Sequence, residues 1–532
     1  MKLTRRDFLR LGGLTAVAAG TAGCSVIGRE LNQNELPERL TLPTAVPGTA
    51  PLTQSAPNLP SQAINPVRRL LNRAGYGPAP GEIERVSGLG LAAYLEEQLN
   101  DEGIADTASD LIARHQTLYH MDASLLLEQE PKDATIELIG STFMRAIYSQ
   151  RQLYEAMVEF WSDHFNIYLR KEQVMPLAKI VDDREVIRPY ALTNFRDLLG
   201  ASAQSPAMLL YLDNISNEKS HPNENYAREL LELHTLGVNG GYSQQDVQEV
   251  ARILTGWTVA RNGRLRGQFI FDDARHDFGE KRVLGKIFPA GRGVEEVAEL
   301  LDLLAGHPAT ATFLATKLVR RFVADAPPAD LVTQVAEAYR QSGGEIKAML
   351  RVIFLSDAFA SAPAKLKRPH TFMVSVLRTL HVDLRFGRGR ALADWMAMMG
   401  QPLFLWPPPD GYPDVSEAWA ANLLPRWNFA LALLHNEIPG ATVPLDDLLA
   451  AGGADTAVST IQLFAGLIYG RSLQENELAM FTDYLASQSL QENELAMFTD
   501  YLASQSLEDA EAETRLRDCV ALMLASREFQ WT

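Results

Sequence analysis

The sequence has little of several features that would assign it quickly to a class. Its 532 residues contain only two cysteines, so no disulfide framework can form. Lys and Arg number 49 against 66 Asp and Glu, a formal net charge of −17, and no basic arm or stripe offsets this balance. Nucleic acid would be repelled by that average field. The charge therefore argues against a phosphate-backbone binder, and we expect no nucleic-acid partner.

Familiar catalytic signatures are also missing. The sequence contains no H-E-x-x-H zinc motif, no G-x-S-x-G nucleophile elbow, no phosphate-binding P-loop and no glycine-rich dinucleotide fingerprint. With 46% apolar and 22% charged residues, the composition is that of a globular protein with a large core. This composition excludes collagen-like, disordered and polytopic membrane proteins.

What is present begins with an export leader in residues 1–24. A charged N-terminal segment with paired arginines is followed by a short apolar stretch and then by small residues of the kind found at cleavage sites. This order is typical of an export signal. The Arg-Arg-x-Phe-Leu pattern resembles a twin-arginine address. Thr21-Ala22-Gly23-Cys24 is similar to a lipoprotein cleavage box, although Thr stands where Leu is usual. Either a lipid is attached at Cys24 or ordinary cleavage nearby leaves no anchor. We expect a periplasmic or cell-surface protein that meets the membrane only through its signal or that lipid.

The rest of the chain divides into a tether and one large domain. Residues 25–66 are rich in Pro, Thr and Ser and lack an apolar period, which predicts an extended tether. Residues 67–532 predict a mainly α fold, one large multi-helix domain that is single or two-lobed. The exception is 257–288, where two short apolar runs predict a small β-hairpin or irregular strands. The clearest helical segments are 84–99, 133–170, 224–236, 243–256, 294–304, 308–322, 329–341, 345–356, 368–382, 415–435, 456–467 and 514–526.

One 17-residue segment is duplicated letter for letter. Residues 472–488 recur as residues 489–505, and each copy opens with the Ser-x-x-Glu pattern of a helix-capping box. In a continuous helix the two copies would be out of phase by roughly 100°. The chain must therefore break between them if both copies are to present one apolar face. We assign no chemistry to the repeat.

Three stretches are dense in residue types found at functional sites. The first reads Glu-Phe-Trp-Ser-Asp-His-Phe and places His164 on an aromatic helical face with Trp161. Glu155, Glu159 and Asp163 lie together on another side of the same helix. A lone histidine among aromatic residues is either a packed core residue or a ligand.

The second stretch is an acidic helix that begins near residue 224. Asn225, Glu229 and Glu232 fall at i, i+4 and i+7, so their side chains converge on one face with Arg228 beside them. Two carboxylates one turn apart can hold a cation or position a proton. The alternative is a solvated face with ion pairs among Glu224, Arg228 and Glu232.

The third stretch, residues 272–281, follows the expected strand and carries His276, Asp277 and Lys281. Loops of this composition often bear function on a rigid scaffold, and a charged surface turn is the alternative. Further on, the proline-rich aromatic segment 406–413 predicts a stiff, non-helical corner. It either walls a pocket or closes the fold.

Taken in order, these motifs resemble a large bacterial family, domain of unknown function 1800 (DUF1800). The resemblance implies an exported, mainly helical protein, often with a twin-arginine leader and with no established reaction. It also implies a co-encoded second exported protein that resembles the sulfatase and phosphatase superfamily. The 17-residue duplication is an extra copy beyond the family's pattern. The resemblance rests on 70–78, 161–165, 223–237, 242–247, 254–257, 276–281, the proline corner, Trp419 and Arg426.

Two functions follow from these observations. The favoured one is a helical binding or scaffold partner of the co-encoded exported protein, because no complete catalytic constellation can be identified. In that case the acidic helix is a buried ion-pair network that fixes helix register. The sequence does not indicate an oligomeric state.

The alternative is a metal-assisted hydrolase that acts on an envelope or extracellular substrate. Its divalent metal would be held by His164, Glu229, Glu232 and His276. Its catalytic groups would be Glu229, His276 and Asp277, and Arg228, Lys281 and Asn225 would bind an anionic substrate. Whether the protein is an enzyme is left open between these two hypotheses.

Overall fold

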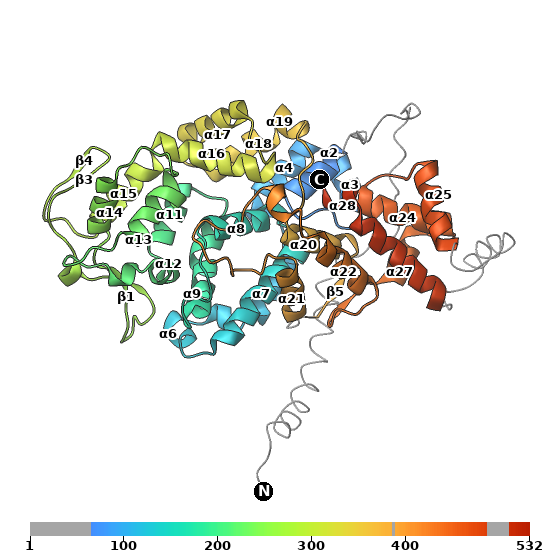
Figure 1. Ribbon diagram of the computed structural model, residues 1–532, viewed down its shortest axis with the longest axis horizontal. Coiled ribbons are helices and arrows are strands. Elements are labelled where there is room, and N and C mark those ends of the chain that lie inside the picture. Colours follow the sequence, from blue (N-terminus) through green and yellow to red (C-terminus); the bar gives the residue numbers. More distant parts are fainter. Residues whose placement is uncertain (1–64, 386–388, 487–509) are drawn as a thin grey trace, which may run out of the picture.

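The computed structural model describes residues 65–385, 389–486 and 510–532. The leader with Cys24, nearly all of the tether and the second copy of the repeat lie outside these residues. The described chain is mainly helical (Figure 1), which confirms the expected fold class. Proline in the first turn begins α7, α16 and α20, where its missing N–H leaves no helical hydrogen bond unmade.

In chain order the α-helices are α2 (Pro66–Arg73), α3 (Glu82–Leu89), α4 (Leu91–Leu99), α5 (Thr107–His115), α6 (Ala123–Leu126), α7 (Pro131–Tyr148), α8 (Gln152–His164), α9 (Met175–Asp182), α10 (Arg188–Tyr190), α11 (Phe195–Ala203), α12 (Pro206–Tyr211), α13 (Glu224–Glu229), α14 (Gln244–Ile253), α15 (Glu295–Ala305), α16 (Pro308–Phe322), α17 (Ala329–Ser342), α18 (Ile346–Phe354), α19 (Asp357–Ala360), α20 (Pro369–Thr379), α21 (Gly389–Met398), α22 (Leu423–Leu434), α23 (Leu445–Gly452), α24 (Ala457–Tyr469), α25 (Glu475–Ala486), α27 (Ala510–Ala525) and α28 (Arg527–Gln530). Two π-helical turns, η3 (Asp183–Ile187) and η5 (Leu230–Thr235), extend α9 and α13.

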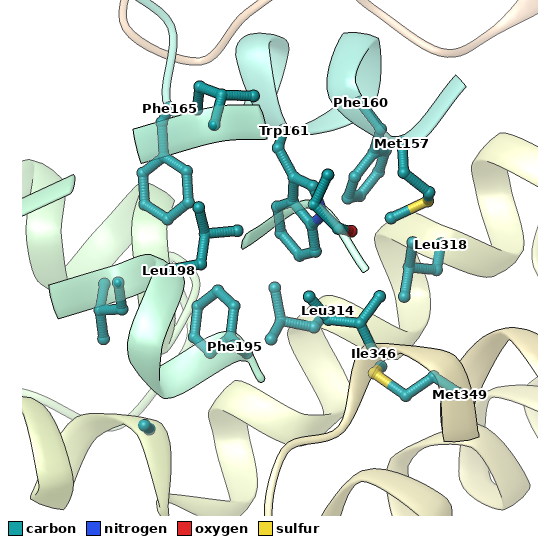
Figure 2. Packing of buried hydrophobic residues seen from close by; sticks show 14 of the residues in the cluster. Met157, Phe160, Trp161, Phe165, Phe195, Leu198, Leu314, Leu318, Ile346 and Met349 are labelled. Carbon is teal, nitrogen blue, oxygen red and sulfur yellow. The ribbon is translucent and has the colours of Figure 1, made fainter. Parts of the chain in front are cut away.

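Two large hydrophobic clusters form most of the core. The first lies between residues 70 and 362 and is centred on α8, α11, α16 and α18 (Figure 2). Trp161 of α8 is fully buried there among Phe165, Phe195 and Leu314, and its indole N–H donates to the Ala191 carbonyl at 3.0 Å. A buried indole needs such a partner, so this hydrogen bond fixes the rotation of α8.

The second cluster is built from α5, α7 and the elements that follow α19, together with Tyr76. It includes Phe372 of α20, Phe429 of α22, Ile461 of α24 and Cys519 of α27. Burial raises the pKa of the Cys519 thiol to about 12, so this cysteine packs as an apolar residue. The first copy of the repeat forms α25, which adds Phe481 to the same cluster.

Short antiparallel strand pairs account for the β-structure. The expected insertion at 257–288 contains β1 (Trp257–Val259) with β2 (Phe269–Phe271), and β3 (Lys281–Val283) with β4 (Lys286–Phe288). A third pair, β5 (Asp383–Leu384) with β6 (Ala441–Thr442), was not expected from the sequence. Two-residue strands are too short to show an alternating pattern.

Three predicted helices are broken in the structure. The segment 415–435 divides into the 3-10 turn η7 (Ser416–Trp419) and α22. The segment 133–170 divides into α7 and α8 at Ser149, whose hydroxyl donates to Asp106 at 2.5 Å. The segment 84–99 divides into α3 and α4 at Gly90, which has a φ of +90° that a helix does not allow.

Among the described residues, no single helix has the length and apolar composition required to cross a bilayer. Only the pair α23 and α24, which is bent by 101°, meets these criteria jointly.

Candidate functional site

A small polar pocket lies where three segments distant in sequence meet: the end of α8, the start of α20 and the loop from Gln401 to Tyr412. It encloses about 40 Å³, which is room for about three ordered waters. Carboxylates and cations line it together with apolar side chains such as Val158, Leu403 and Phe404. The charged and amide residues on its walls include Glu155, Glu159, Asp163, Asn166, Asp183, Arg188, Arg368 and His370.

Glu159 joins several elements at this pocket. Its Oε2 accepts from Nη2 of Arg321 at 2.8 Å and from the Tyr76 hydroxyl at 3.0 Å. Its Oε1 lies 3.3 Å from Nδ1 of His370. Burial alone would raise the pKa of this carboxyl, but Arg321, His370 and Arg368 outweigh burial and hold the pKa of Glu159 well below 4.5. Glu159 is therefore ionised at neutral pH.

Arg368 connects the end of α8 to the loop that follows Tyr412. Its Nη2 donates to Oδ2 of Asp163 at 2.6 Å, and its Nη1 donates to Oδ1 of Asp414 at 3.0 Å. Arg321 donates to the same Asp414 oxygen at 3.0 Å, so two guanidinium groups share one carboxylate. Burial raises the pKa of Asp163 in spite of Arg368. Buried ion pairs of this kind are better at fixing geometry than at adding stability.

Two buried polar atoms of this pocket make no hydrogen bond with the described residues. They are Nε2 of His370 and Nε of Arg368, whereas Nδ1 of His370 and Oε1 of Glu159 face each other at 3.3 Å. His370 is 0% exposed. An unsatisfied buried donor or acceptor costs about 1–3 kcal/mol, and folded proteins keep few of them. These atoms therefore leave capacity in the pocket for a polar group that both donates and accepts hydrogen bonds.

The opposite wall of the pocket is closed by a second buried ion-pair set. Arg188 binds Glu155 through both η nitrogens, at 3.0 and 3.1 Å, and donates from Nε to Asp183 at 2.8 Å. Asp183 opens the π-helical turn η3. Such turns are frequent at functional sites because the extra residue displaces side chains from the ordinary helical positions.

The proline-rich corner contributes one residue to the pocket and also packs against the rest of the fold. Tyr412 lines the pocket, and Gly411 lies against the backbone carbonyl of Asp163 at the end of α8. Asn166 donates to the carbonyl oxygens of Trp406 and Pro408 at 2.9 and 2.7 Å. The corner is thus held by the residues that directly follow α8.

His164 is a packed core residue held by two polar partners. It is 1% exposed, and its ring lies edge-on to Trp161 and Phe165. Nε2 lies 3.1 Å from the carbonyl oxygen of His234, and Nδ1 lies 3.0 Å from Nζ of Lys317. Burial, Lys317 and His234 hold the pKa of His164 well below 6.5. Both ring nitrogens are engaged, so neither is directed at a metal position.

The acidic helix α13 and η5 are a half-buried surface rather than a closed cluster. Arg228 donates to Glu224 at 3.0 Å, and Glu232 accepts from the Tyr242 hydroxyl at 3.2 Å. Asn225 donates to the Leu212 carbonyl at 3.1 Å. Burial and the neighbouring Glu232 raise the pKa of Glu229. The structure therefore contains the Glu224–Arg228 pair expected for a solvated face.

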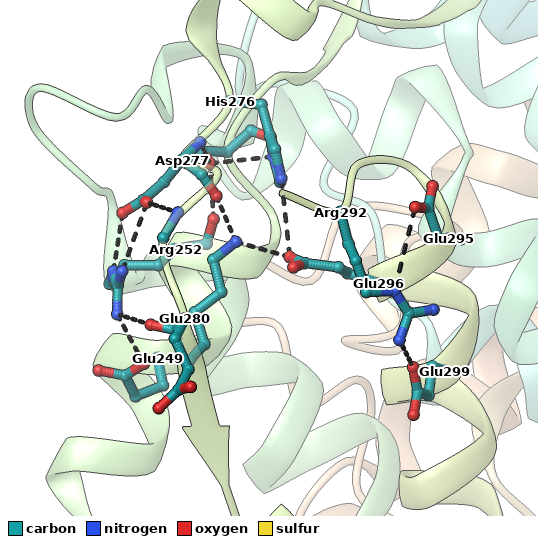
Figure 3. Close-up of polar contacts among 12 residues, drawn as sticks. Glu249, Arg252, His276, Asp277, Glu280, Arg292, Glu295, Glu296 and Glu299 are labelled. Atoms are coloured by element: carbon teal, nitrogen blue, oxygen red, sulfur yellow. Dashed lines mark hydrogen bonds and ion pairs between the residues drawn. The ribbon is translucent and has the colours of Figure 1, made fainter. Parts of the chain in front are cut away.

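His276 and Lys281, the first residue of β3, belong to a separate buried network. Figure 3 shows His276 with Glu296 and Asp277 from this network. Nε2 of His276 lies 3.6 Å from Oε2 of Glu296, and Nζ of Lys281 donates to that oxygen at 2.6 Å. Nδ1 of His276 lies 2.7 Å from the Thr255 carbonyl. His276, Lys281 and Glu296 are each at most 1% exposed. In this arrangement the amine of Lys281 is committed to the Glu296 carboxylate.

Asp277 is bound within the same network. Nε and Nη2 of Arg252 donate to its carboxylate at 2.7 and 3.3 Å, and the Gly279 N–H donates to it at 2.8 Å (Figure 3). Burial alone would raise the pKa of Asp277, but Arg252 and the Gly279 N–H hold it below 3.8. This pairing fixes the turn that follows η6 (Asp273–Arg275).

The predicted metal centre is not assembled. Within residues 65–385, 389–486 and 510–532, no group of three or more His, Cys, Asp or Glu side chains is placed to hold an ion. His164 and His276 have different partners in different networks. Glu229 and Glu232 lie on a half-buried helix, and neither histidine contacts them. The residues predicted to hold a divalent metal therefore do not fit one ion.

Sequence reasoning missed the residues that complete the central pocket. Arg321 lies 162 residues from its partner Glu159, and Arg368 lies 205 residues from its partner Asp163. His370 is farther still from Glu159 along the sequence. No local pattern connects positions so far apart. One signal was present: Glu155, Glu159 and Asp163 form a stripe of acids on α8, and buried acids require cations nearby.

Comparison with known proteins gives one family and no individual relative. No curated protein and no solved structure matches the chain. A family profile described as "Protein of unknown function (DUF1800)" matches residues 69–531, nearly the whole chain. This match includes α8, α20 and the proline-rich corner, which contribute lining residues to the pocket, and α16, whose Arg321 binds Glu159. The chain belongs to this DUF1800 family.

Proposed function

We propose that the protein is an exported binding protein of the cell envelope, and that its central pocket receives a polar group of its partner. One observation carries this proposal. His370 is wholly buried beside the pocket and its Nδ1 faces Glu159, yet its Nε2 has no hydrogen bond within the described residues. Arg368 adds an unsatisfied donor, its Nε, at the same place. Atoms of this kind are the ordinary basis of recognition by hydrogen bonding.

Binding is favoured over hydrolysis by the state of the predicted catalytic residues. Asp277 is held by Arg252, and Lys281 and His276 are closed inside a buried network. In the pocket, in contrast, the ionised groups form ion pairs, and the polar atoms without hydrogen bonds lie within a small volume. This arrangement suits the recognition of a small polar group better than the movement of protons.

Export and the partner come from the sequence. The paired Arg5 and Arg6 ahead of the apolar stretch support twin-arginine export to the periplasm or cell surface, with lipid attachment at Cys24 as one outcome. Membership of the family supports the co-encoded exported protein that resembles the sulfatase and phosphatase superfamily as the partner to be tested first.

The experiment is titration calorimetry between the purified chain and that exported neighbour. His370→Leu removes the unsatisfied Nε2 and leaves an apolar side chain of similar size. We expect the variant to bind at least ten-fold more weakly and to remain folded, because Arg321 still binds the Glu159 carboxylate when the contact with His370 is lost.

His221→Leu, the same change at an exposed histidine, is the control and is expected to bind as the original chain does. Unchanged affinity of His370→Leu would show that the pocket is not the binding site. Absence of binding by the original chain would exclude this partner.

A further inference from the structure

A second pocket lies between α7 and the paired strands β5 and β6. It encloses about 220 Å³ and shares no lining residue with the central pocket. On its α7 side the lining includes Ile136, Gly140, Phe143 and Met144. These positions are spaced i, i+4, i+7 and i+8, so they lie on one face of the helix. Thr142, which lines the central pocket, lies on the opposite face, so the two pockets are separate sites.

The other walls of this second pocket are also apolar. Leu384 of β5, Leu392 of α21 and Ile438 ahead of β6 contribute buried side chains to the lining. The backbone between these walls is already paired, since the N–H of Arg385 donates to the Gly440 carbonyl at 2.8 Å. The second pocket therefore presents mainly hydrocarbon to anything that enters it.

The polar side chains inside the second pocket have partners within the fold. The Ser141 hydroxyl donates to the Leu138 carbonyl at 3.0 Å. The Glu137 carboxylate accepts from the N–H groups of Leu118 and Tyr119 at 3.1 and 2.8 Å. Among the described residues that line this pocket, no side chain has a buried polar atom without a hydrogen bond. The interior therefore does not require a polar ligand, in contrast to the central pocket.

Gly140 is an independent sign that this space is kept open. It lies in the middle of α7, where glycine is destabilising relative to alanine. Its backbone does not have the positive φ that favours glycine, and an added Cβ would meet no atom within 4 Å. Neither conformation nor close packing explains this glycine. A larger side chain at position 140 would extend into the pocket that the residue lines.

The rim of the second pocket carries one charge of each sign. Asp133, Arg385 and Pro439 are exposed, so the pocket is open to solvent on their side. Neither Asp133 nor Arg385 forms an ion pair within 4.0 Å in the described part of the chain. Their opposite charges favour neither an anion nor a cation. An ionised ligand would also lose its hydration against apolar walls without a dedicated counter-ion inside the pocket.

We propose that this second pocket binds an uncharged, apolar small molecule about the size of one or two fused aromatic rings. An apolar cavity of about 150 Å³ is sufficient for benzene, whereas drug-sized ligands occupy about 300–1,000 Å³. The second pocket, at about 220 Å³, lies between these sizes. Removal of apolar surface from water supplies the affinity. This inference does not rest on the function proposed for the central pocket.

The test is titration calorimetry with indole, an uncharged molecule of two fused rings. We expect the original chain to bind indole at a single site with a Kd below about 1 mM. Gly140→Leu places a side chain in the pocket and should weaken binding by about ten-fold or more. Its Tm should be unchanged or raised, because leucine favours a helix more than glycine does.

Gly88→Leu is the matched control. Gly88 also lies within a helix, α3, and a Cβ added there meets no atom within 4 Å, but it does not line the pocket. This variant should bind indole as the original chain does. Absence of indole binding by the original chain, or equal binding by Gly140→Leu, would overturn the proposed site.

Two further measurements complete the test. Indole-3-acetate and tryptamine are the anionic and cationic relatives of indole, and tighter binding of either one would overturn the assignment to uncharged ligands. If Gly140→Leu does not fold, methyl NMR of the original chain decides. The methyl signal of Met144, identified with Met144→Leu, should shift when indole is added. A signal that does not move at saturating indole would overturn the site.

Discussion

Gly411 lies directly over the backbone carbonyl oxygen of Asp163, with a φ of +75°. A Cβ at position 411 would overlap that oxygen, and the left-handed conformation would be strained as well. We expect Gly411→Ala to lower the free energy of unfolding by about 2–4 kcal/mol, measured by urea denaturation. Gly453→Ala is the matched control, since Gly453 has a φ of +60° and no atom near its added Cβ. It should cost only about 1 kcal/mol, and equal costs would show that the contact with Asp163 does not hold the corner.

The buried network of Lys281, Glu296 and His276 gives a prediction about stability rather than activity. Lys281→Met leaves the Glu296 carboxylate buried without its cation, which we expect to cost about 3–5 kcal/mol. The double variant Lys281→Met/Glu296→Leu removes both charges and should recover most of that loss, as a thermal melt would show. If the double variant is as unstable as the single one, the pair is not the source of the effect.

Two buried histidines predict a loss of stability in mild acid. Burial and Lys317 lower the pKa of His234 to about 3, and the pKa of His164 is also far below 6.5. Each folded-state pKa is depressed, so the unfolded chain binds more protons below pH 6.5, and the stability present above that pH is lost as the pH falls. Between pH 7 and pH 5 we expect a loss of about 2 kcal/mol for each histidine.

Urea denaturation at both pH values measures this loss, and His234→Leu should reduce it by about half. A pH dependence that is unchanged in the variant would mean that His234 is not one of the groups responsible.

Metal removal separates the binding hypothesis from the hydrolase. We expect dialysis against EDTA to leave the Tm unchanged, because no three ligands converge among the described residues. A resident ion at 100 times its Kd would stabilise the fold by about 2.7 kcal/mol, a shift that a melt detects. Near-stoichiometric metal in protein from the exported fraction, lost in a folded Glu229→Gln/His276→Ala variant, would instead support the hydrolase.

The duplicated segment predicts non-additive substitutions. Phe481 of the first copy is buried in the second hydrophobic cluster, and Phe498 is its counterpart in the second copy. Because the two copies are identical, the second can replace the first when Phe481 alone is changed. We expect Phe481→Ala and Phe498→Ala each to cost under about 1 kcal/mol and the double variant about 3 kcal/mol. A cost for Phe481→Ala equal to that of the double variant would show that only the first copy is used.

Local patterns predicted the fold class and the strand insertion, since apolar periods of 3.6 and 2 are local properties of a sequence. They did not predict the break at Ser149, because that break depends on Asp106, which lies 43 residues earlier. The π-helical turn η5 was likewise hidden within a segment that reads as an ordinary helix.

The candidate site was only partly predictable. The stripe of Glu159 and Asp163 on α8 marked the correct helix, but their partners Arg321 and Arg368 are set by tertiary structure alone. His164 was weighed as a ligand and is a core residue, because the aromatic face that carries it turns inward.

The ion pairs that join Glu159, Arg321, Arg368 and Asp414 also constrain how the chain is made. Bringing together segments that lie this far apart in the sequence costs much configurational entropy before any stabilising contact forms. Such contacts therefore form late in folding. Until Asp414 has emerged from the ribosome, both arginines lack one of the two carboxylates that they share, and the centre is incomplete. A nascent chain in that state exposes apolar surface and is prone to aggregate. Most of the chain must therefore be synthesised before the centre of the fold is complete.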